Sequence, residues 1–236
     1  MTPNNLDSFI VSKKPPPEAL AASQEIRDRG SLFSATIYSA TSPSQASACI
    51  THVRNVVHAL KPASHEMSAW RCMVVKQGST GLGGPEDFEV REGSSDDGER
   101  WGGEKILGLM RKQGVLDAVV IVSRWYGGVM LGPARFSHIE TCTVEVCREF
   151  RRREEVSEAL STLNTLDDIL KQLRTELAVL RQQSAGTERK AAEYSSWIDQ
   201  DLPKARRLIR ARESAISTVK ELIVKEQTAS QAPPPP

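Results

Sequence analysis

Regular alternation of apolar and polar positions begins at Gly30. Residues 31–40 alternate in this way and are rich in strand-forming side chains, so they predict a β-strand. The sequence Ser42-Pro43-Ser44-Gln45 is typical of a capping box with proline at the first helical position, and it predicts the start of a helix. An apolar stripe then predicts a helix that ends near Pro62, and it consists of Ile50, Val53, Val57 and Leu60.

The next elements predict two more strands and a second helix. Residues 69–75 predict a strand and residues 104–112 predict a helix. Between them, residues 77–98 are rich in glycine and predict a loop, in which a further strand can be hidden near Phe88. The continuous apolar run at 117–123 is typical of a strand that is covered on both faces.

A glycine turn after that run leads into another helix, which is expected to begin at about Pro133. Strands and helices therefore follow one another over residues 30–150, and this order predicts a single α+β domain. Residues 1–29, which include three consecutive prolines, are expected to form a mobile N-terminal arm. Residues 229–236 end in four prolines and are expected to form a disordered tail.

Beyond Phe150 the apolar residues recur in alternating steps of three and four, which predicts the seam of a coiled coil. The first run consists of Val156, Ala159, Leu163, Leu166, Leu170, Leu173, Leu177 and Leu180. The second run has similar spacing, with Arg212 at one seam position, and consists of Ile198, Leu202, Ala205, Ile209, Ile216, Val219 and Ile223.

The break between the two runs, at Ser184–Thr187, has the length of a turn between antiparallel helices. Residues 151–228 therefore predict an antiparallel coiled-coil hairpin. Pro203 lies inside the second run and is expected to kink or restart that helix, with Asp201 as a candidate cap. Two helices cover their apolar stripe poorly, so we expect the hairpin to pack on the first domain, to form a homodimer or to bind a partner protein. The expected partner seam consists of Leu163, Leu166, Leu170, Leu173, Leu177 and Leu180.

Composition and charge fit an ordinary globular protein. The chain has 39% apolar residues, 26% charged residues and a net charge of +1, which excludes nucleic-acid binding by bulk charge alone. No apolar run approaches the roughly 20 residues that span a bilayer, so we expect no membrane contact. The cysteines form no CxxC pair and no histidine lies at metal-ligand spacing, so we expect reduced thiols in a cytoplasmic protein, with no metal and no cofactor. These cysteines are Cys49, Cys72, Cys142 and Cys147.

Two segments carry more chemistry than packing requires. The first, Asp96–Gly103, combines three carboxylates with three glycines just before a predicted helix, and the second, Ser123–Phe136, joins a buried strand to a helix. Ligand-binding loops of α/β proteins often lie in such positions. The candidate residues for an anion site or a partner-binding loop are Asp97, Gly98, Glu99, Arg124, Tyr126, Gly127, Gly128, Gly132, Arg135 and His138.

These segments have functional and purely structural interpretations. Glycine amides together with Arg124 and Arg135 could hold a phosphate or an RNA backbone. Alternatively, the glycines only permit tight turns, and Arg124 pairs with Asp97 or Glu99 to join two loops. A metal site would need oxygen ligands from elsewhere in the chain. His138 has no nucleophile or second acid placed beside it by the sequence, so no catalytic residue and no enzyme activity are expected.

A basic run in the second helical segment raises the alternative of RNA binding. Aromatic side chains that could stack on bases are scarce there, with Tyr194 and Trp197 nearby, and a solvated helix face explains the same residues. The basic run consists of Lys204, Arg206, Arg207, Arg210 and Arg212.

The motifs of the first domain resemble the signature of the IMPACT/YigZ family. The matching segments are Asp97-Gly98-Glu99, the Arg-Trp-Tyr-Gly-Gly sequence at 124–128 and the Leu-Gly-Pro-x-Arg-Phe sequence at 131–136. Gly30-Ser31-x-Phe33-x-Ala35 and Ala69-Trp70-Arg71 also match in order. The residues of the second and third motifs resemble those of eukaryotic IMPACT more than those of bacterial YigZ. Gly102 and Ala134 depart from the alanine and aspartate that are usual in the family.

The resemblance implies a two-layer α/β sandwich of the type found in the second domain of ribosomal protein S-five. It also implies a non-enzymatic regulator of translation initiation. IMPACT-like proteins restrain the general-control kinase that phosphorylates initiation factor two during amino-acid starvation, by competing for the kinase's ribosome-associated activator. In IMPACT an RWD domain precedes this domain, whereas only residues 1–29 precede it here.

We therefore expect an IMPACT-like regulator that acts by protein contacts, with the helical hairpin in place of the RWD domain. The alternative function is an RNA- or ribosome-binding module that uses the glycine loops and the basic helix.

Overall fold

The structure is a computed structural model that describes residues 15–181 and 193–230. The expected turn at Ser184–Thr187, residues 1–14 of the expected arm and residues 231–236 of the expected tail lie outside these ranges. Contacts divide the chain into two compact units, Met1–Arg151 and Arg152–Pro236, which are described separately below. Within the described ranges, no helix combines the length and the apolar character needed to cross a membrane.

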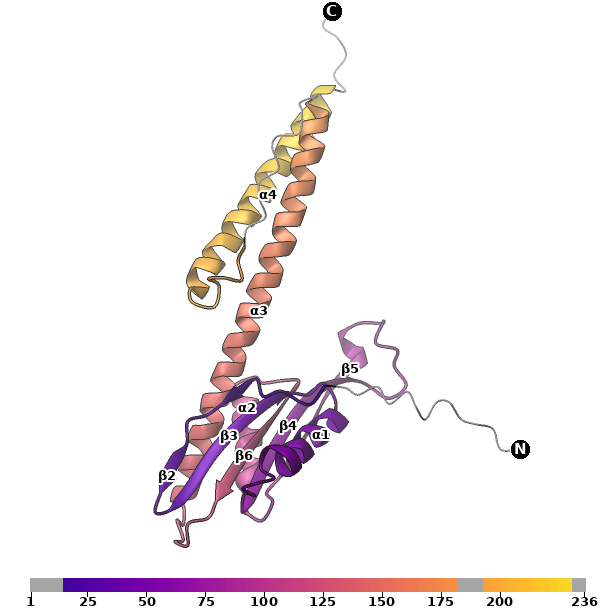
Figure 1. The fold of residues 1–236 in the computed structure, drawn as a ribbon. Coiled ribbons are helices and arrows are strands. Elements are labelled where there is room, and N and C mark those ends of the chain that lie inside the picture. Colours follow the sequence, from indigo (N-terminus) through magenta and orange to yellow (C-terminus); the bar gives the residue numbers. More distant parts are fainter. Residues whose placement is uncertain (1–14, 182–192, 231–236) are drawn as a thin grey trace, which may run out of the picture. The chain divides into compact units, whose positions relative to one another are not determined.

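The first unit is built on a six-stranded antiparallel sheet (Figure 1). The strand order is β1-β3-β6-β4-β5, and β2 pairs with β3 beside β1. The strands are β1 (Ala21–Ala22), β2 (Ile26–Asp28), β3 (Ser31–Ser39), β4 (His65–Val75), β5 (Phe88–Ser95) and β6 (Ala118–Trp125). The mixed α/β class is confirmed, and each of the three predicted strands corresponds to an observed one. The strand suspected near Phe88 is the edge strand β5.

Part of the expected N-terminal arm belongs to the sheet, so that prediction was wrong for residues 21–28. Ala21 pairs with Ile37 of β3, and Ile26 pairs with Phe33. Both strands are too short to show a period of two in the sequence. Their pairing with β3 is a tertiary effect that local pattern does not reveal.

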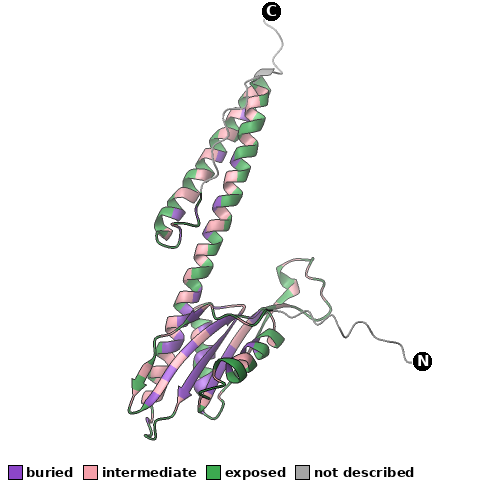
Figure 2. Cartoon of the chain, in the orientation of Figure 1, coloured by how far each residue is buried: buried purple, intermediate pink, exposed green. Residues whose placement is uncertain are grey.

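Helices cover both faces of the sheet. On one face, α2 (Gly102–Lys112) and the first part of α3 (Ala134–Leu180) bury the main core, which includes Phe33, Ile37, Met67, Val120 and Ile139. On the other face, α1 (Pro43–His52) packs over Tyr38, Val119 and Ile121. Figure 2 shows that the central strands are largely buried. The expected two layers therefore gain a third, because α1 covers the face opposite α2 and α3.

The start of α1 follows the sequence closely. The Gln45 amide donates to the Ser42 hydroxyl at 3.3 Å, and the Gln45 side chain accepts from the Thr41 amide at 2.9 Å. The end of the predicted helix differs, because the chain continues as a π-helix, η2 (Val53–Val57). The wider turn changes the direction of the predicted apolar stripe. Val53 is buried, whereas Val57 and Leu60 are 51% and 101% exposed.

The second unit consists of the C-terminal part of α3 and of α4 (Leu202–Ser230). The expected antiparallel arrangement is wrong, because ion pairs along the two helices follow the same order in both. Glu155 pairs with Arg206 at 3.0 Å, Asp167 with Arg212 at 2.5 Å, and Arg181 with Glu226 at 2.7 Å. The helices therefore run parallel (Figure 1).

The position of the α4 start explains this correction. Asp201 accepts the Lys204 amide at 2.9 Å, so the expected cap is present and Pro203 lies in the first turn instead of kinking a longer helix. The helix α4 therefore begins beside Glu155, in the early part of the α3 segment of this unit, and runs in the same direction as α3.

The parallel seam uses some of the predicted leucines. Leu163 and Leu170 are buried, whereas Leu166, Leu173, Leu177 and Leu180 are half-buried. Leu163 packs with Tyr194, Ile198 and Ala205 in a separate core. The seam also contains a polar group, because Asp167 lies beside both Arg212 and the Tyr194 hydroxyl.

Candidate functional site

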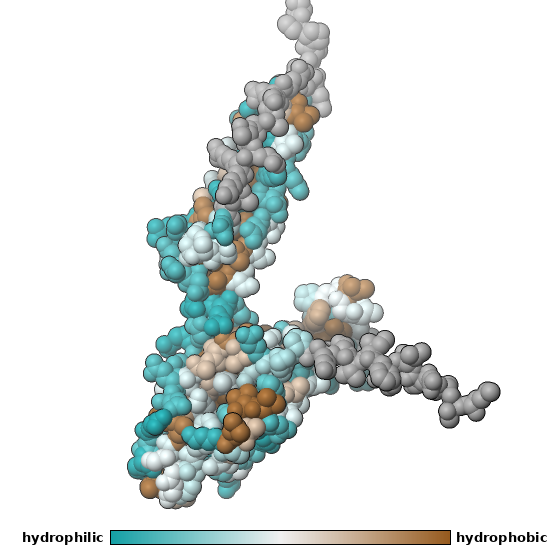
Figure 3. Space-filling view, in the orientation of Figure 1, coloured by the Kyte–Doolittle hydropathy of each residue, from teal (hydrophilic) through white to brown (hydrophobic). Residues whose placement is uncertain are grey.

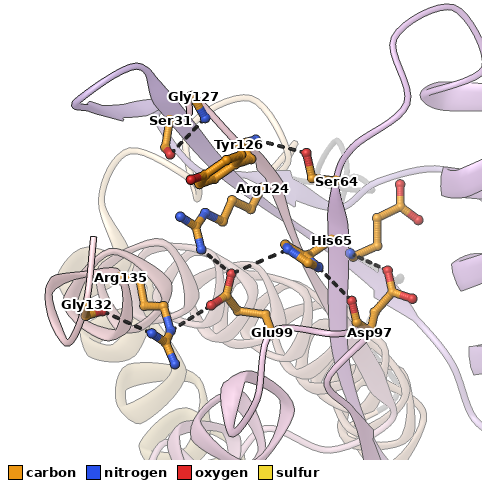
Figure 4. A network of polar contacts seen from close by, with 11 residues as sticks. Ser31, Ser64, His65, Asp97, Glu99, Arg124, Tyr126, Gly127, Gly132 and Arg135 are labelled. Atoms are coloured by element: carbon orange, nitrogen blue, oxygen red, sulfur yellow. Dashed lines mark hydrogen bonds and ion pairs between the residues drawn. The ribbon is translucent and has the colours of Figure 1, made fainter. Parts of the chain in front are cut away.

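Several candidate residues of the first unit, among them Arg124 and Arg135, meet around the buried carboxylate of Glu99 (Figure 4). Glu99 is 5% exposed and lies in the loop between β5 and α2. One oxygen accepts from Arg124 at the end of β6, and the other lies 2.6 Å from Nε of Arg135 at the start of α3. One carboxylate thus joins three elements that are far apart in the sequence. The sequence offers Asp97 and Glu99 as partners for Arg124, and in the structure Arg124 pairs with Glu99.

The turn that carries Glu99 is fixed by Asp96. One carboxylate oxygen of Asp96 accepts the Trp101 amide and the other accepts the Gly103 amide, each at 2.9 Å. Asp96 therefore satisfies amides at the start of α2 that have no partner within the helix. The turn needs left-handed backbone, with φ of 45° at Asp97 and 86° at Gly98. Its glycine is required by the turn and does not itself indicate a ligand.

Asp97 links this turn to a second buried carboxylate, Glu66. The Glu66 amide donates to Asp97 at 2.7 Å, and Arg54 lies 3.0 Å from Asp97 and 3.3 Å from Glu66. His58 lies 2.8 Å from the other oxygen of Glu66, and His65 lies 4.0 Å from Glu99. The three carboxylates of the segment 96–103, Asp96, Asp97 and Glu99, therefore have separate protein partners. Among the described residues, no group of three metal-ligating side chains converges.

Sequence reasoning missed Arg54, His58, His65 and Glu66. The sequence predicts a strand from residue 69, whereas β4 begins at His65, so the polar start of the strand falls outside the prediction. Arg54 and His58 lie on or next to η2, which the apolar stripe predicts as part of one continuous α-helix. The charged pair His65-Glu66 directly before an apolar strand was the available signal.

The glycine loop after β6 packs against the turn between β2 and β3. A Cβ atom on Gly127 would lie 1.9 Å from the carbonyl carbon of Gly30. The Gly127 amide also donates to the Ser31 hydroxyl at 3.2 Å. Gly127 is therefore needed for close backbone approach, whereas Gly128 and Gly132 have positive φ angles of 86° and 56°.

His138 lies apart from Glu99 and has its own partner. Its Nε2 lies 2.8 Å from the Asp28 carboxylate, and its ring packs on Phe33 with a centroid distance of 5.2 Å. Hydrogen bonds from Arg29 and His138 lower the pKa of Asp28 to about 2. Arg124 contacts the same Phe33 ring at 5.3 Å, so His138 and Arg124 share one aromatic neighbour.

The buried cysteines do not supply a reactive thiol. Burial raises the pKa of Cys147 to about 12 and that of Cys72 to about 11. At neutral pH both are therefore protonated and weakly nucleophilic. They contribute packing instead, with Cys147 in the main core.

The charged side chains of the site pair with one another, and its exposed part is apolar and aromatic. Glu99 offsets one of the two positive charges of Arg124 and Arg135, which reduces the attraction of these arginines for an anion. Among the buried side-chain nitrogen and oxygen atoms of the described residues, only Nε of Arg124 and the poorly aligned Nε of Arg135 find no hydrogen-bond acceptor. Beside the ion pair, Tyr126 is 45% exposed, and its ring centroid lies 5.4 Å from the guanidinium carbon of Arg124. Val129 and Met130 follow it at 47% and 77% exposure. Such a loop is better suited to protein contact than to holding a phosphate.

The basic residues of α4 are also partly engaged. Lys204 lies 4.3 Å from the Trp197 ring, Arg206 pairs with Glu155, and Arg212 pairs with Asp167. Arg207 and Arg210 are exposed. The basic run is thus largely a solvated helix face with pairs to α3.

Comparison with known proteins places these motifs in a family. Residues 29–147 match the family described as the Impact N-terminal domain. The chain is 36% identical to the "Protein IMPACT homolog" of Saccharomyces cerevisiae over 130 residues, which cover 55% of this chain and 46% of that protein. It is 31% identical to an IMPACT family member of Schizosaccharomyces pombe over 166 residues, covering 70% of this chain and 43% of the relative. The matches thus span less than half of these relatives.

Two solved structures are also similar. The two-domain translational regulator Yih1 is 36% identical, with a TM-score of 0.36, and the match covers 56% of this chain and 47% of that one. A hypothetical protein is 20% identical, with a TM-score of 0.41, and the match covers 64% of this chain and 75% of that one.

Proposed function

The chain belongs to the Impact N-terminal domain family, and from this membership we propose that it regulates translation by binding protein partners. The match to the family covers residues 29–147, which include Glu99, Arg124 and Arg135. Relatives from yeast and vertebrates carry the IMPACT name, and one similar structure is that of a translational regulator. The family membership is the single observation that carries this proposal.

The loop that follows β6 is the proposed partner-binding surface. It is positioned at one end by the buried pair of Glu99 and Arg124 and by Gly127 against Gly30. Arg135, which also pairs with Glu99, holds the far end of the segment, and the residues between Arg124 and Arg135 expose Tyr126, Val129 and Met130. A rigid loop with exposed apolar side chains loses little conformational entropy on binding, which favours affinity.

The proposed pathway is the response to amino-acid starvation. In this role the protein acts in the cytoplasm without catalysis and binds the ribosome-associated activator of the kinase that phosphorylates initiation factor two. It thereby limits the activity of the kinase. The α3–α4 unit serves as a second docking or dimerising element, through the half-buried leucines Leu166, Leu173, Leu177 and Leu180.

Affinity purification from starved and fed cells, followed by mass spectrometry, tests this proposal. The tagged wild-type protein is expected to recover the kinase's activator, and Met130→Glu is expected to lose it. Leu82→Glu is the matched control, because Leu82 is 91% exposed in the hairpin at the other end of β4. Equal recovery by both variants would remove the loop from the proposal.

The same purification separates the alternative function. Recovery of RNA or ribosomes in place of a protein partner, lost in high salt and in Arg207→Glu/Arg210→Glu, would support the RNA-binding module. Recovery of neither class from cells that contain both would contradict the proposed role in translation.

A further inference from the structure

The strand β5 forms an edge of the sheet. Its pairing with β4 runs from Phe88, opposite Val75, to Ser95, opposite Ser68. It is the last strand in the order β1-β3-β6-β4-β5. Among the residues that the structure describes, no strand pairs with its outer side. Its eight residues therefore present a row of backbone donors and acceptors that another strand can use.

The hydrogen-bond register shows which residues of β5 face outward. The Lys76 amide donates to the carbonyl oxygen of Asp87 at 2.7 Å. Hydrogen-bonded and non-hydrogen-bonded residues alternate along an antiparallel pair. Asp87, Glu89 and Arg91 therefore direct their backbone groups toward β4. Phe88, Val90 and Glu92 direct theirs away from it.

The hairpin of β4 and β5 also exposes apolar side chains next to this edge. Met73 lies opposite Val90 and Val75 lies opposite Phe88, so the four side chains share one face. Their exposed fractions are 39%, 41%, 44% and 36% in that order. Figure 3 shows brown apolar surface on this hairpin. An apolar cluster beside an open strand edge is typical of a binding surface.

We propose that this edge pairs with β5 of a second copy of the chain, antiparallel, with the two-fold axis at Val90. This register places Val90 opposite Val90 of the second copy. It places Glu89 opposite the second copy's Arg91, and Arg91 opposite the second copy's Glu89. Glu89 and Arg91 already lie on one face, 3.2 Å apart, with side chains 41% and 60% exposed. Two cross-strand ion pairs therefore form without any change of face.

The other two-fold registers are unfavourable for charge. The axis can pass beside a hydrogen-bonded or a non-hydrogen-bonded residue of the strand, so every position is compared. An axis at Glu89 or Arg91 brings like charges directly opposite one another, and an axis at Gly93 leaves Phe88 to Val90 unpaired. An axis at Phe88 brings Glu89 opposite Asp87, and an axis at Glu92 brings two glutamates together. An axis at Ser94 leaves most of the strand unpaired. The sequence Phe88-Glu89-Val90-Arg91-Glu92 is thus self-complementary at Val90 alone, which singles out a second copy as the occupant.

Charge reversal tests the proposal through the molecular mass in solution, measured by sedimentation equilibrium over a range of concentrations. The wild type is expected to form dimers. Glu89→Arg and Arg91→Glu each place like charges opposite one another, and each is expected to weaken dimerisation at least about tenfold. An equimolar mixture of the two variants is expected to recover the dimer, since each cross-strand pair between the two different chains then joins an arginine to a glutamate.

The matched control reverses a similar exposed pair elsewhere. Glu25 and Arg27 lie 2.8 Å apart with side chains 52% and 78% exposed, so Glu25→Arg and Arg27→Glu should leave the dimer unchanged. A wild type that stays monomeric would overturn the proposal. Dimers that survive both reversals at positions 89 and 91 would also overturn it, and would assign association to another surface such as the α3–α4 unit.

Cysteine cross-linking gives a second readout that does not depend on affinity. Val90→Cys places two thiols at the proposed axis, where Cα atoms of a hydrogen-bonded pair lie about 5.5 Å apart, within disulfide range. Phe88→Cys is the control, because the two copies of residue 88 would lie roughly 13 Å apart. The native cysteines are buried and do not compete. Equal cross-linking of both variants would contradict the register.

Discussion

Glu99 and Arg124 form an ion pair in which both side chains are 6% exposed, and this pair joins the loop before α2 to the end of β6. A buried pair is costly to break from one side only, because the remaining charge has neither water nor a partner. Removal of the Glu99 charge would leave two arginines without their carboxylate, since Arg135 also pairs with Glu99.

Glu99→Gln is therefore expected to lower the free energy of unfolding by about 3–5 kcal/mol. Glu140→Gln is the matched control, because Glu140 pairs with Lys105 at 2.9 Å with side chains 40% and 48% exposed. Loss of an exposed pair costs at most about 1 kcal/mol. Urea unfolding of both variants measures the difference. Equal stability of the two would show that the buried pair does not hold the loops together.

Two glycine substitutions are expected to act in opposite directions. Gly127→Ala would place its Cβ 1.9 Å from a backbone carbon of Gly30, so the β2–β3 turn must move, and we expect destabilisation of more than about 2 kcal/mol. Gly108→Ala meets nothing within 4 Å on the exposed side of α2 and is expected to stabilise by about 0.5–1 kcal/mol. Thermal unfolding followed by circular dichroism gives both values. A stable Gly127→Ala would contradict the close approach of the two turns.

The parallel arrangement of α3 and α4 can be measured with pairs of spin labels. Labels at Glu155 and Arg206, and labels at Arg181 and Glu226, are both expected to give short distances. Labels at Glu155 and Glu226 should lie roughly 40 Å apart, from the rise of α3 between residues 155 and 181. An antiparallel hairpin would reverse this, with the last pair close together.

Asp28 is expected to stabilise the fold above acidic pH. Its pKa is lowered from 3.8 to about 2, so the folded state binds the proton less readily than the unfolded state does. The stability it contributes is fully present above pH 3.8 and is lost as the pH falls through about 2. The difference in stability between wild type and Asp28→Asn should therefore shrink over that interval. A difference that is constant with pH would show that the pairs with Arg29 and His138 are not formed in solution.

Local patterns in the sequence predicted the elements whose packing agrees with them. The cap at Ser42 and the doubly covered run of β6 are examples, because each depends on residues adjacent in the chain. The strands β1 and β2, the π-helix at Val53 and the parallel course of α4 were not predictable in this way. Each depends on pairing with distant residues, such as that of Asp167 with Arg212.

The candidate site shows the same division. The motifs indicated Glu99 and Arg124 because both lie in segments unusually rich in charge and glycine. Glu66 and its partners Arg54 and His58 were missed because they meet only when η2 packs beside the start of β4.

The most direct test of the proposed function is the level of phosphorylated initiation factor two in starved cells that overproduce the protein. We expect the wild type to lower this level and Met130→Glu to lose that effect at equal abundance, while Leu82→Glu keeps it. An unchanged level with the wild type, or equal activity of Met130→Glu, would contradict regulation through the loop after β6.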